Sequence, residues 1–297
     1  MKKIYLLIAI VLLGVSACKP SEDITGVPSY VHIQKADVHI PGNNFLVQGD
    51  SFQNITDIWL SVSGSALGAY ELPATIPALF DGNQNLGIQA GIKENGTGAT
   101  RAIYPFYTYI IKNVNLQRTK TLDVHPIFQY DPKTKFIFNE RFENSNPTIQ
   151  PFVGNNTAKI SYPKFTDPNY ALYGENRCME AQLINSDSGT FYASDLKSRT
   201  GFTIGNPVWM EISFNTEVPL TVGMFVVQAG TGSSYSSDLV TLNTTGGLWK
   251  KVYINFTDLI YNEAAGSGYS FYIEGFKAAG NQIDHIYIDN IKLLCFE

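Results

Sequence analysis

The feature that most constrains this chain is a long series of short, alternating apolar runs separated by turn residues. After residue 18 there is no helical periodicity of useful length. Runs rich in Val, Ile, Tyr and Phe recur instead, punctuated by Gly, Asn and Asp, which is the pattern of an all-β protein. In residues 58–63, for example, the apolar Ile58, Leu60 and Val62 alternate with the other residues. We therefore expect a strand with one packed face and one solvent face.

The candidate strands fall into two groups on either side of a short polar segment. Residues 131–135 (Asp-Pro-Lys-Thr-Lys) are turn-prone, so we expect a linker there. The candidate strands before this linker are 30–35, 57–63, 67–71, 85–93, 107–116 and 121–129, and those after it are 136–142, 158–162, 178–184, 208–215, 220–228, 249–256, 269–276 and 285–294. The sequence thus predicts two β-sandwiches in series, residues 29–130 and 136–297, held in a restricted orientation by the short linker. The spacing of the second group fits a jelly roll.

A hairpin is expected within the first group. Residues 91–96 end in Asn95-Gly96, and an Asn-Gly pair between strands is typical of a tight two-residue turn.

The first eighteen residues have the organisation of an export signal. Lys2 and Lys3 precede an apolar run over residues 4–15, which is shorter than the roughly 20 residues that a membrane-spanning helix needs. The run ends in Val-Ser-Ala-Cys at 15–18, which resembles the lipobox of bacterial lipoproteins. The resemblance implies removal of residues 1–17 and acylation of Cys18. An ordinary cleaved signal with a chance cysteine is the alternative.

The residues around Cys18 also bear on location. A multi-chain lipid anchor holds a protein stably on a membrane. Lys19 stands where Asp is the usual inner-membrane retention signal, so the resemblance implies the outer membrane. Residues 18–28 form a tether whose Ser-Glu-Asp at 21–23 resembles that of surface-exported lipoproteins, although a solvated linker explains it equally well. We expect an outer-membrane lipoprotein exposed at the cell surface.

Composition and motifs exclude several functions. Lys and Arg number 21 against 26 Asp and Glu, without a basic cluster, so nucleic acid is not an expected partner. The sequence has no HExxH, Walker loop, GxSxG elbow or dinucleotide-binding glycine motif, and no zinc-like Cys/His spacing. These absences favour a protein without catalytic activity. A glycoside hydrolase using carboxylates among Glu211, Glu274 and Asp289 is the minor alternative.

Two further resemblances suggest a fold family for each domain. Residues 57–79 resemble part of a small Ig-like sandwich of surface lipoproteins, PEGA-type domains among them. The second domain resembles galactose-binding-like jelly rolls and carbohydrate-binding modules in three blocks, 138–143, 249–254 and 286–293. Many such modules hold a structural Ca²⁺ between a carboxylate of the first strand and the Asp of the last. The matching residues are Glu140 or Glu143 with Asp289, with solvated carboxylates as the alternative.

The two cysteines of the second domain are a candidate disulfide. An exported chain lies in an oxidising compartment, where Cys178 and Cys295 are able to pair if their strands meet. Two buried thiols are the alternative.

Strand parity in the second domain points to a glycan-binding face. The positions opposite the expected core carry aromatic rings interleaved with carboxylate and ammonium groups. They are Trp209, Glu211, Lys251, Tyr253, Tyr272, Glu274 and Tyr287. Sugars need both kinds of group, because their C–H faces stack on rings and their hydroxyls need donors and acceptors. The alternatives are that loops or the first domain cover this face, or that it binds another envelope protein in a structural or adhesive assembly.

Overall fold

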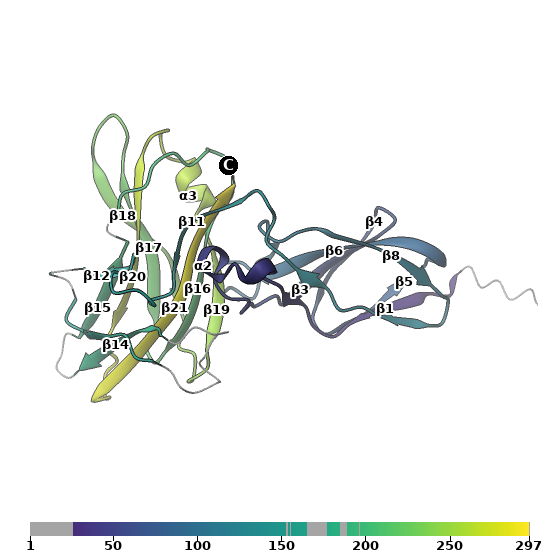
Figure 1. The fold of residues 1–297 in the computed structure, drawn as a ribbon, viewed down its shortest axis with the longest axis horizontal. Coiled ribbons are helices and arrows are strands. Elements are labelled where there is room, and N and C mark those ends of the chain that lie inside the picture. The colour runs from purple at the N-terminus through teal and green to yellow at the C-terminus, as the bar shows by residue number, and fades with distance from the viewer. Residues whose placement is uncertain are drawn as a thin grey trace, which may run out of the picture.

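The computed structural model describes residues 26–152, 154, 156–164, 177–184, 189–195 and 197–296. The fold is all-β, and its strands form two β-sandwiches in series, as the sequence predicts. Figure 1 shows them end to end, with the second domain on the left. None of the helices in these described ranges is long and apolar enough to cross a membrane. Cys18 and the predicted signal peptide lie outside the described residues.

The first domain contains ten strands and two short helical turns. Their bounds are β1 Ser29–Ile33, β2 Asp37–Val38, η3 Pro41–Asn43, α2 Phe45–Gln48, β3 Asp57–Val62, β4 Ser65–Glu71, β5 Ala74–Ala78, β6 Gly82–Lys93, β7 Arg101–Ile103, β8 Ile110–Leu116, β9 Thr121–Asp123 and β10 Ile127–Phe128. The largest sheet has the order β4-β3-β6-β7, with β8 also paired to β6. The smaller sheets are β5-β1-β9 and β10-β2.

The second domain is a jelly roll of two larger sheets. Its elements are β11 Thr134–Glu140, β12 Gln150–Pro151, β13 Lys159–Ser161, β14 Met179–Ile184, β15 Thr190–Ser194, β16 Val208–Thr216, β17 Leu220–Val227, β18 Ser234–Leu242, β19 Lys250–Asn255, α3 Thr257–Tyr261, β20 Gly268–Phe276 and β21 Ile283–Phe296. One sheet has the order β13-β14-β21-β16-β19, with β11 also paired to β21, and we call it the junction sheet. The other has the order β12-β15-β20-β17-β18, and we call it the distal sheet, because it lies on the side away from the first domain (Figure 1).

The core of the second domain lies between these two sheets. Val222, Met224 and Val226 of β17 are buried there, as are Met210 and Ile212 of β16. Every residue of β16 is buried, on both faces of the strand. The alternation seen in the sequence is therefore present, but it does not mark a solvent face here, because the first domain covers the outer side of the junction sheet.

Two local predictions for the first domain are confirmed. Ile58, Leu60 and Val62 of β3 all point into its core. Asn95 and Gly96 both have positive φ, at 54° and 67°, and the Thr97 N–H donates to the Glu94 carbonyl at 3.0 Å. These are the features of a type I′ turn, which requires left-handed backbone at both central residues. The turn lies within the longer connection 94–100 between β6 and β7, and is not a two-residue link between paired strands.

The two domains meet along more than the connecting segment. β10 ends at Phe128 and β11 begins at Thr134, inside the expected linker 131–135. A second connection runs through residues 41–54 of the first domain, where α2 packs on β11. The Asn139 side chain of β11 donates to the Phe45 carbonyl at 3.4 Å. The junction is therefore an extended interface.

Candidate functional site

The seven residues expected to form one glycan-binding face lie in three separate places. Trp209 and Glu211 of β16 and Lys251 and Tyr253 of β19 do share the outer face of the junction sheet. However, all four are 5% exposed or less, because the first domain packs on them. The expectation that they form an open binding face is wrong, and the alternative of cover by the first domain is correct.

A buried charge cluster occupies the centre of this interface. The Glu211 carboxylate accepts hydrogen bonds from the hydroxyl groups of Tyr104, at 2.6 Å, and Tyr130, at 2.9 Å, both in the first domain. It also pairs with the ammonium groups of Lys251, at 2.8 Å, and Lys292, at 3.5 Å. A carboxylate with this many partners stays ionised despite its burial.

Asp50 of the first domain balances the second positive charge. Its Oδ1 lies 3.9 Å from the ammonium nitrogens of both Lys251 and Lys292. The two lysines also donate to backbone carbonyls of this segment, Lys251 to Phe52 at 2.8 Å and Lys292 to Asp50 at 3.2 Å. A Cβ at residue 49 would collide with the Lys292 side chain, so the close approach requires Gly49. Asp50 of the first domain thus faces Glu211, Lys251 and Lys292 of the second domain across the boundary.

The charges in the cluster shift one another's pKa values. Burial alone would raise the pKa of Glu211, but the charges of Lys251 and Lys292 lower it to about 2. Burial, together with the neighbouring charge of Lys251, lowers the pKa of Lys292 to about 8. Burial raises the pKa of Tyr253 to about 12. These groups are enclosed between the two domains, and Asp50 contributes its charge at 3.9 Å without a hydrogen bond to its carboxylate oxygens, so we assign the cluster a structural role.

Tyr272 and Glu274 lie instead on the outer face of the distal sheet. There they join aromatic residues that the sequence interpretation missed. Tyr272 stacks on Tyr192 of β15 with ring centroids 5.5 Å apart, and it contacts Phe225 of β17 at 4.9 Å. Phe152 follows β12 and packs edge-on against Tyr192 at 5.6 Å. Four rings therefore form a continuous aromatic group across four strands.

A glycine and a carboxylate fix the position of the Tyr272 ring. Gly223 lies opposite Tyr272 in the sheet, and a Cβ there would collide with the ring. The Tyr272 hydroxyl donates to Oδ1 of Asp238 on β18. Tyr192 and Tyr272 are only 8% and 3% exposed, whereas Phe225 is half-buried and Asp238 is exposed. The tyrosines therefore form a fixed floor, and Phe225 and the carboxylates provide the accessible groups.

The charge of Asp238 affects the pKa of Glu274 on this face. Glu274 is half-buried, and its burial, followed by the charge of Asp238, raises its pKa above the usual value. Burial and the hydrogen bond to Asp238 raise the pKa of Tyr272 well above its normal range. The tyrosine hydroxyl therefore remains a donor to Asp238.

Tyr287 lies in the third place, on the half of the junction sheet that includes β14. Its ring is nearly parallel to that of His285, with centroids 5.8 Å apart. Both side chains bond to Oε1 of Glu180, His285 at 3.0 Å and Tyr287 at 3.3 Å. Tyr287 is thus separated from Tyr272 and Glu274 by the thickness of the sandwich.

The calcium site expected at Glu140 or Glu143 with Asp289 stays a prediction, and each of these carboxylates has a backbone hydrogen-bond partner. Glu140 accepts hydrogen bonds from the backbone N–H groups of Phe142, at 2.6 Å, and Thr148. Glu143 accepts from the Arg177 N–H at 2.8 Å, and Asp289 accepts from the N–H that follows it in the chain at 2.7 Å. Within the described ranges no group of three or more His, Cys, Asp or Glu side chains is placed to hold a metal ion. Through these hydrogen bonds Glu140, Glu143 and Asp289 hold loops and strand ends.

Cys178 and Cys295 do not form the expected disulfide. β14 and β21 are antiparallel with Met179 opposite Ile288, so Cys178 lies level with Asp289. Cys295 is further along β21, about 20 Å away at the usual rise of a strand. A disulfide requires Cα atoms within about 7 Å. Both side chains are buried thiols, and burial raises the pKa of Cys178.

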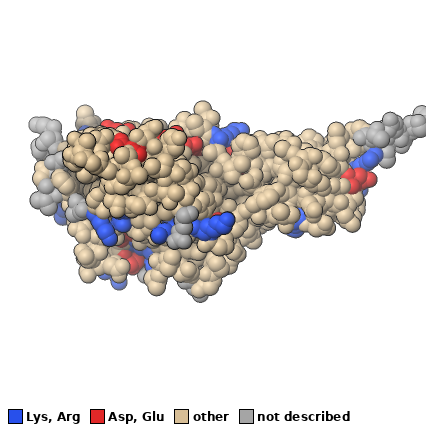
Figure 2. All heavy atoms as spheres, turned by 90° about the horizontal axis from the view of Figure 1, so that it is seen from above, with Lys and Arg blue, Asp and Glu red and all other residues tan. Residues whose placement is uncertain are grey.

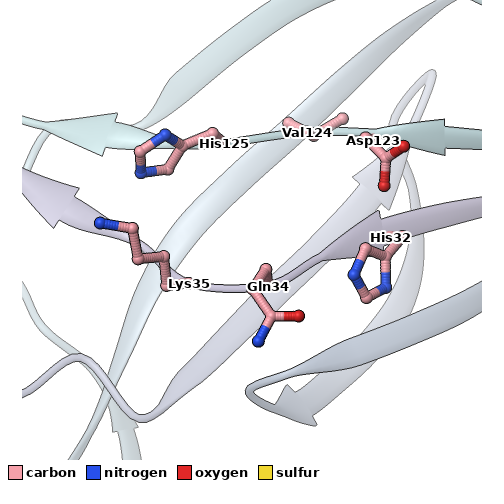
Figure 3. Close-up of a pocket in the computed structure, with 6 residues that line it drawn as sticks. All are labelled: His32, Gln34, Lys35, Asp123, Val124 and His125. Carbon is pink, nitrogen blue, oxygen red and sulfur yellow. The ribbon is translucent and has the colours of Figure 1, made fainter.

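The first domain contains a small pocket next to β1 and β9. Its volume is about 280 Å³, and His32, Lys35, Asp123 and His125 are among the residues that line it (Figure 3). The ammonium of Lys35 and the ring of His125 both bind Oδ2 of Asp37, at 2.8 and 2.7 Å. Burial would raise the pKa of Asp37, but these two partners lower it. Lys35 and His125 of this pocket are thus paired with Asp37 beside it, and we assign no ligand to the pocket.

Comparisons with known proteins give similar structures and no family. No known family model matches the sequence, and no curated protein is similar to it. The CBM22-1 xylan-binding domain of Paenibacillus barcinonensis Xyn10C is 13% identical, with a TM-score of 0.38 over 55% of this chain and 96% of that one. TmCBM61, solved in complex with β-1,4-galactotriose, is 17% identical, with a TM-score of 0.32 over 49% of this chain and 85% of that one.

A third similar structure is the K3 adhesin domain of Lys-gingipain from Porphyromonas gingivalis. It is 13% identical, with a TM-score of 0.36 over 54% of this chain and 98% of that one. At these TM-scores the likeness gives no conclusion about the ligand or the family of this chain.

Proposed function

We propose that this chain is a lipid-anchored surface protein that binds glycan, without catalysis, on the outer face of the distal sheet. The observation that carries the proposal is the combination found there. Four aromatic rings share one face with the carboxylates of Asp238 and Glu274. The half-buried rings of Phe152 and Phe225 offer apolar surface to sugar C–H groups, over the buried floor of Tyr192 and Tyr272, and the carboxylates accept hydrogen bonds from sugar hydroxyls.

The face is rigid, which favours binding. Tyr272 is held by Tyr192 and Phe225 on its sides and by Asp238 at its hydroxyl. The exposed ring of Phe276 extends the same face along β20, four residues beyond Tyr272. Side chains that are already fixed lose little conformational entropy when a ligand arrives.

The membrane anchor is the second part of the proposal. Val-Ser-Ala-Cys at 15–18 resembles a lipobox, and Lys19 is compatible with sorting to the outer membrane. Acylated Cys18 then ties the first domain to the membrane through the tether at 18–28. The first domain acts as a spacer between the lipid and the glycan-binding domain.

The binding face is tested with residues 19–297, which lack the acylated cysteine. The protein is run in affinity gels containing neutral plant and host polysaccharides. Retention should fall about tenfold or more in Phe225→Ala, because one partly buried ring contributes on the order of 1.5 kcal/mol or more to a contact. Tyr261→Ala removes an exposed ring of α3, away from the face, and should retain wild-type binding.

Two outcomes would overturn this assignment. If Tyr287→Ala abolishes retention while Phe225→Ala does not, the glycan binds on the junction sheet instead. If no glycan retains the folded protein, the aromatic face serves another purpose, and a protein partner in the envelope becomes the better explanation. Thermal melting of each variant confirms that the fold is intact.

A further inference from the structure

The outer face of the distal sheet carries acidic side chains but, at its described strand positions, no basic ones. Its strand positions alternate with the core residues of the same strands. They are Thr190, Tyr192 and Ser194 of β15, Ser270, Tyr272, Glu274 and Phe276 of β20, Thr221, Gly223, Phe225 and Val227 of β17, and Ser234, Ser236, Asp238 and Thr241 of β18. Among these described positions there are two acidic residues and no lysine or arginine.

The basic residues that flank the strands of this face have other surroundings: Lys197, three residues after β15, lines a pocket with Lys135 and Phe296, whereas Lys277 and Arg199 form ion pairs. Lys277 directly follows β20, and its ammonium pairs with Asp284 at 3.4 Å. Arg199 bridges to Tyr269 at the start of β20, and its guanidinium pairs with Asp195 at 2.7 Å. Neither charge therefore compensates Asp238 and Glu274. Figure 2 shows the molecule from above, where groups of Lys and Arg and groups of Asp and Glu lie among mostly uncharged side chains.

The two carboxylates act on the same region of the face. Asp238 lies opposite Gly223, which lies opposite Tyr272, and Glu274 is two residues along β20 from Tyr272. The effect of Asp238 on the pKa of Glu274 reflects this proximity. Any ligand that covers Phe225 and Tyr272 therefore lies in a negative field.

This field determines which ligands fit. Ionised carboxylates only accept hydrogen bonds, so the ligand must supply O–H or N–H donors, as the hydroxyls of a neutral sugar do. A ligand with its own carboxylate or sulfate groups places like charges side by side, and salt weakens that repulsion without reversing it.

We propose that the distal face selects neutral glycan chains and rejects polyuronates and sulfated glycans. The inference rests on the proposed function, because it specifies the ligand class of the same face. Asp238 and Glu274 each have two roles here. They bind hydroxyls of the correct chain and repel the charged one.

The test compares polymers that share a backbone and differ in charge. Residues 19–297 are run in affinity gels with fully methyl-esterified homogalacturonan against the de-esterified polymer, and with hydroxyethyl cellulose against carboxymethyl cellulose. We expect retention by at least one neutral polymer and a dissociation constant about tenfold or more higher for its charged counterpart. The double variant Asp238→Asn, Glu274→Gln should reduce that ratio severalfold. Asp258→Asn removes an exposed carboxylate on α3 and should leave the ratio unchanged.

The possible outcomes distinguish a failure of the charge selection from a failure of glycan binding itself. Equal or stronger retention by the charged polymers would overturn the charge selection while leaving glycan binding in place. Selection that persists in the double variant would also overturn it, because the discrimination would not come from these carboxylates. Retention by none of the polymers would overturn both proposals.

Discussion

At the residue scale, the Glu211 carboxylate joins the domains because its donors converge from both of them. Tyr104 and Tyr130 reach it from the first domain, and Lys251 and Lys292 reach it from β19 and β21. Removing one partner of a buried ion pair leaves a buried charge without compensation, which costs about 3–5 kcal/mol. The stability of the whole chain therefore depends on a residue that touches no ligand.

Glu211 makes a specific contribution to the pH dependence of stability. Its pKa is about 2 in the folded chain against an ordinary value of 4.5, so the unfolded chain binds its proton first as the pH falls. The stabilisation is fully present above about pH 4.5 and is lost as the pH falls towards 2. We expect Glu211→Gln to lower the free energy of unfolding by about 3–5 kcal/mol at pH 6. The difference from the wild type should shrink below pH 4.5. Urea titrations at pH values from 6 to 2.5 measure both effects.

The matched control for this prediction is Asp258→Asn, which changes an exposed carboxylate. It should follow the wild-type curve at every pH. A Glu211→Gln curve that stays parallel to the wild type down to pH 2.5 would contradict the ionised state assigned to Glu211.

Strand parity predicted correctly which of these residues share a face, but not what covers it. Trp209, Glu211, Lys251 and Tyr253 do point to one side. Alternation within a strand is a local property, whereas their cover comes from residues 50–54 and 104–130, far away in the sequence. The same pattern of rings and charges suits a sugar or a buried joint, and only the long-range packing distinguishes them.

At the scale of elements, the turn after β6 serves as a docking point on the second domain. The backbone N–H of Asn95 donates to the Tyr253 carbonyl at 2.9 Å, and its side-chain oxygen accepts from the Asn255 N–H at 2.9 Å. The Asn255 side chain in turn donates to Glu94 at 2.7 Å. β19 is the last strand of the junction sheet, so the turn covers an edge that otherwise exposes unpaired backbone groups.

This arrangement makes Asn95 more important than its surface position suggests. Asn95→Ala removes the acceptor for the Asn255 N–H and places alanine at a φ of 54°, which alanine rarely adopts. We expect a loss of about 1–3 kcal/mol in the free energy of unfolding. Chemical denaturation followed by tryptophan fluorescence measures it, since Trp209 lies in the same interface.

Thr97→Ala is the matched control in the same turn, because it truncates an exposed side chain and keeps the backbone hydrogen bonds. It should change stability by less than about 0.5 kcal/mol. Equal effects from the two variants would contradict a specific role for Asn95 in the joint.

Most elements were predictable from the sequence, and the exceptions have a physical cause. Strongly apolar strands such as β3, β16 and β21 show a clear alternation of apolar residues in the sequence. β18 was missed because Ser-Tyr-Ser-Ser-Asp at its start reads as a turn, although an edge strand buries little and needs few apolar residues. β15 was missed between polar segments. These two strands supply Asp238 and Tyr192, so the sequence indicated only part of the face proposed to bind glycan.

At the scale of the whole molecule, the two functions proposed here lie at opposite ends. β1 starts at the end of the first domain that is furthest from the second domain, and the distal sheet closes the other end (Figure 1). The buried charge cluster and the Asn95 turn fix the two domains relative to each other. In the proposed function, the first domain is then a rigid spacer that holds the proposed glycan-binding face away from the membrane.

This geometry predicts that anchoring and binding are independent. In cells, Cys18→Ser should move the protein from the detergent-extracted membrane fraction to the soluble fraction, because no acyl chain then holds it. Its dissociation constant for a neutral glycan should stay within about twofold of the value for detergent-solubilised wild type, since the lipid and the distal face are separated by the whole first domain. Cys178→Ser changes a buried thiol of the second domain and should remain in the membrane fraction. Cys18→Ser protein that still sediments with membranes would contradict the lipid anchor, and one that loses glycan binding would contradict the separation of the two ends.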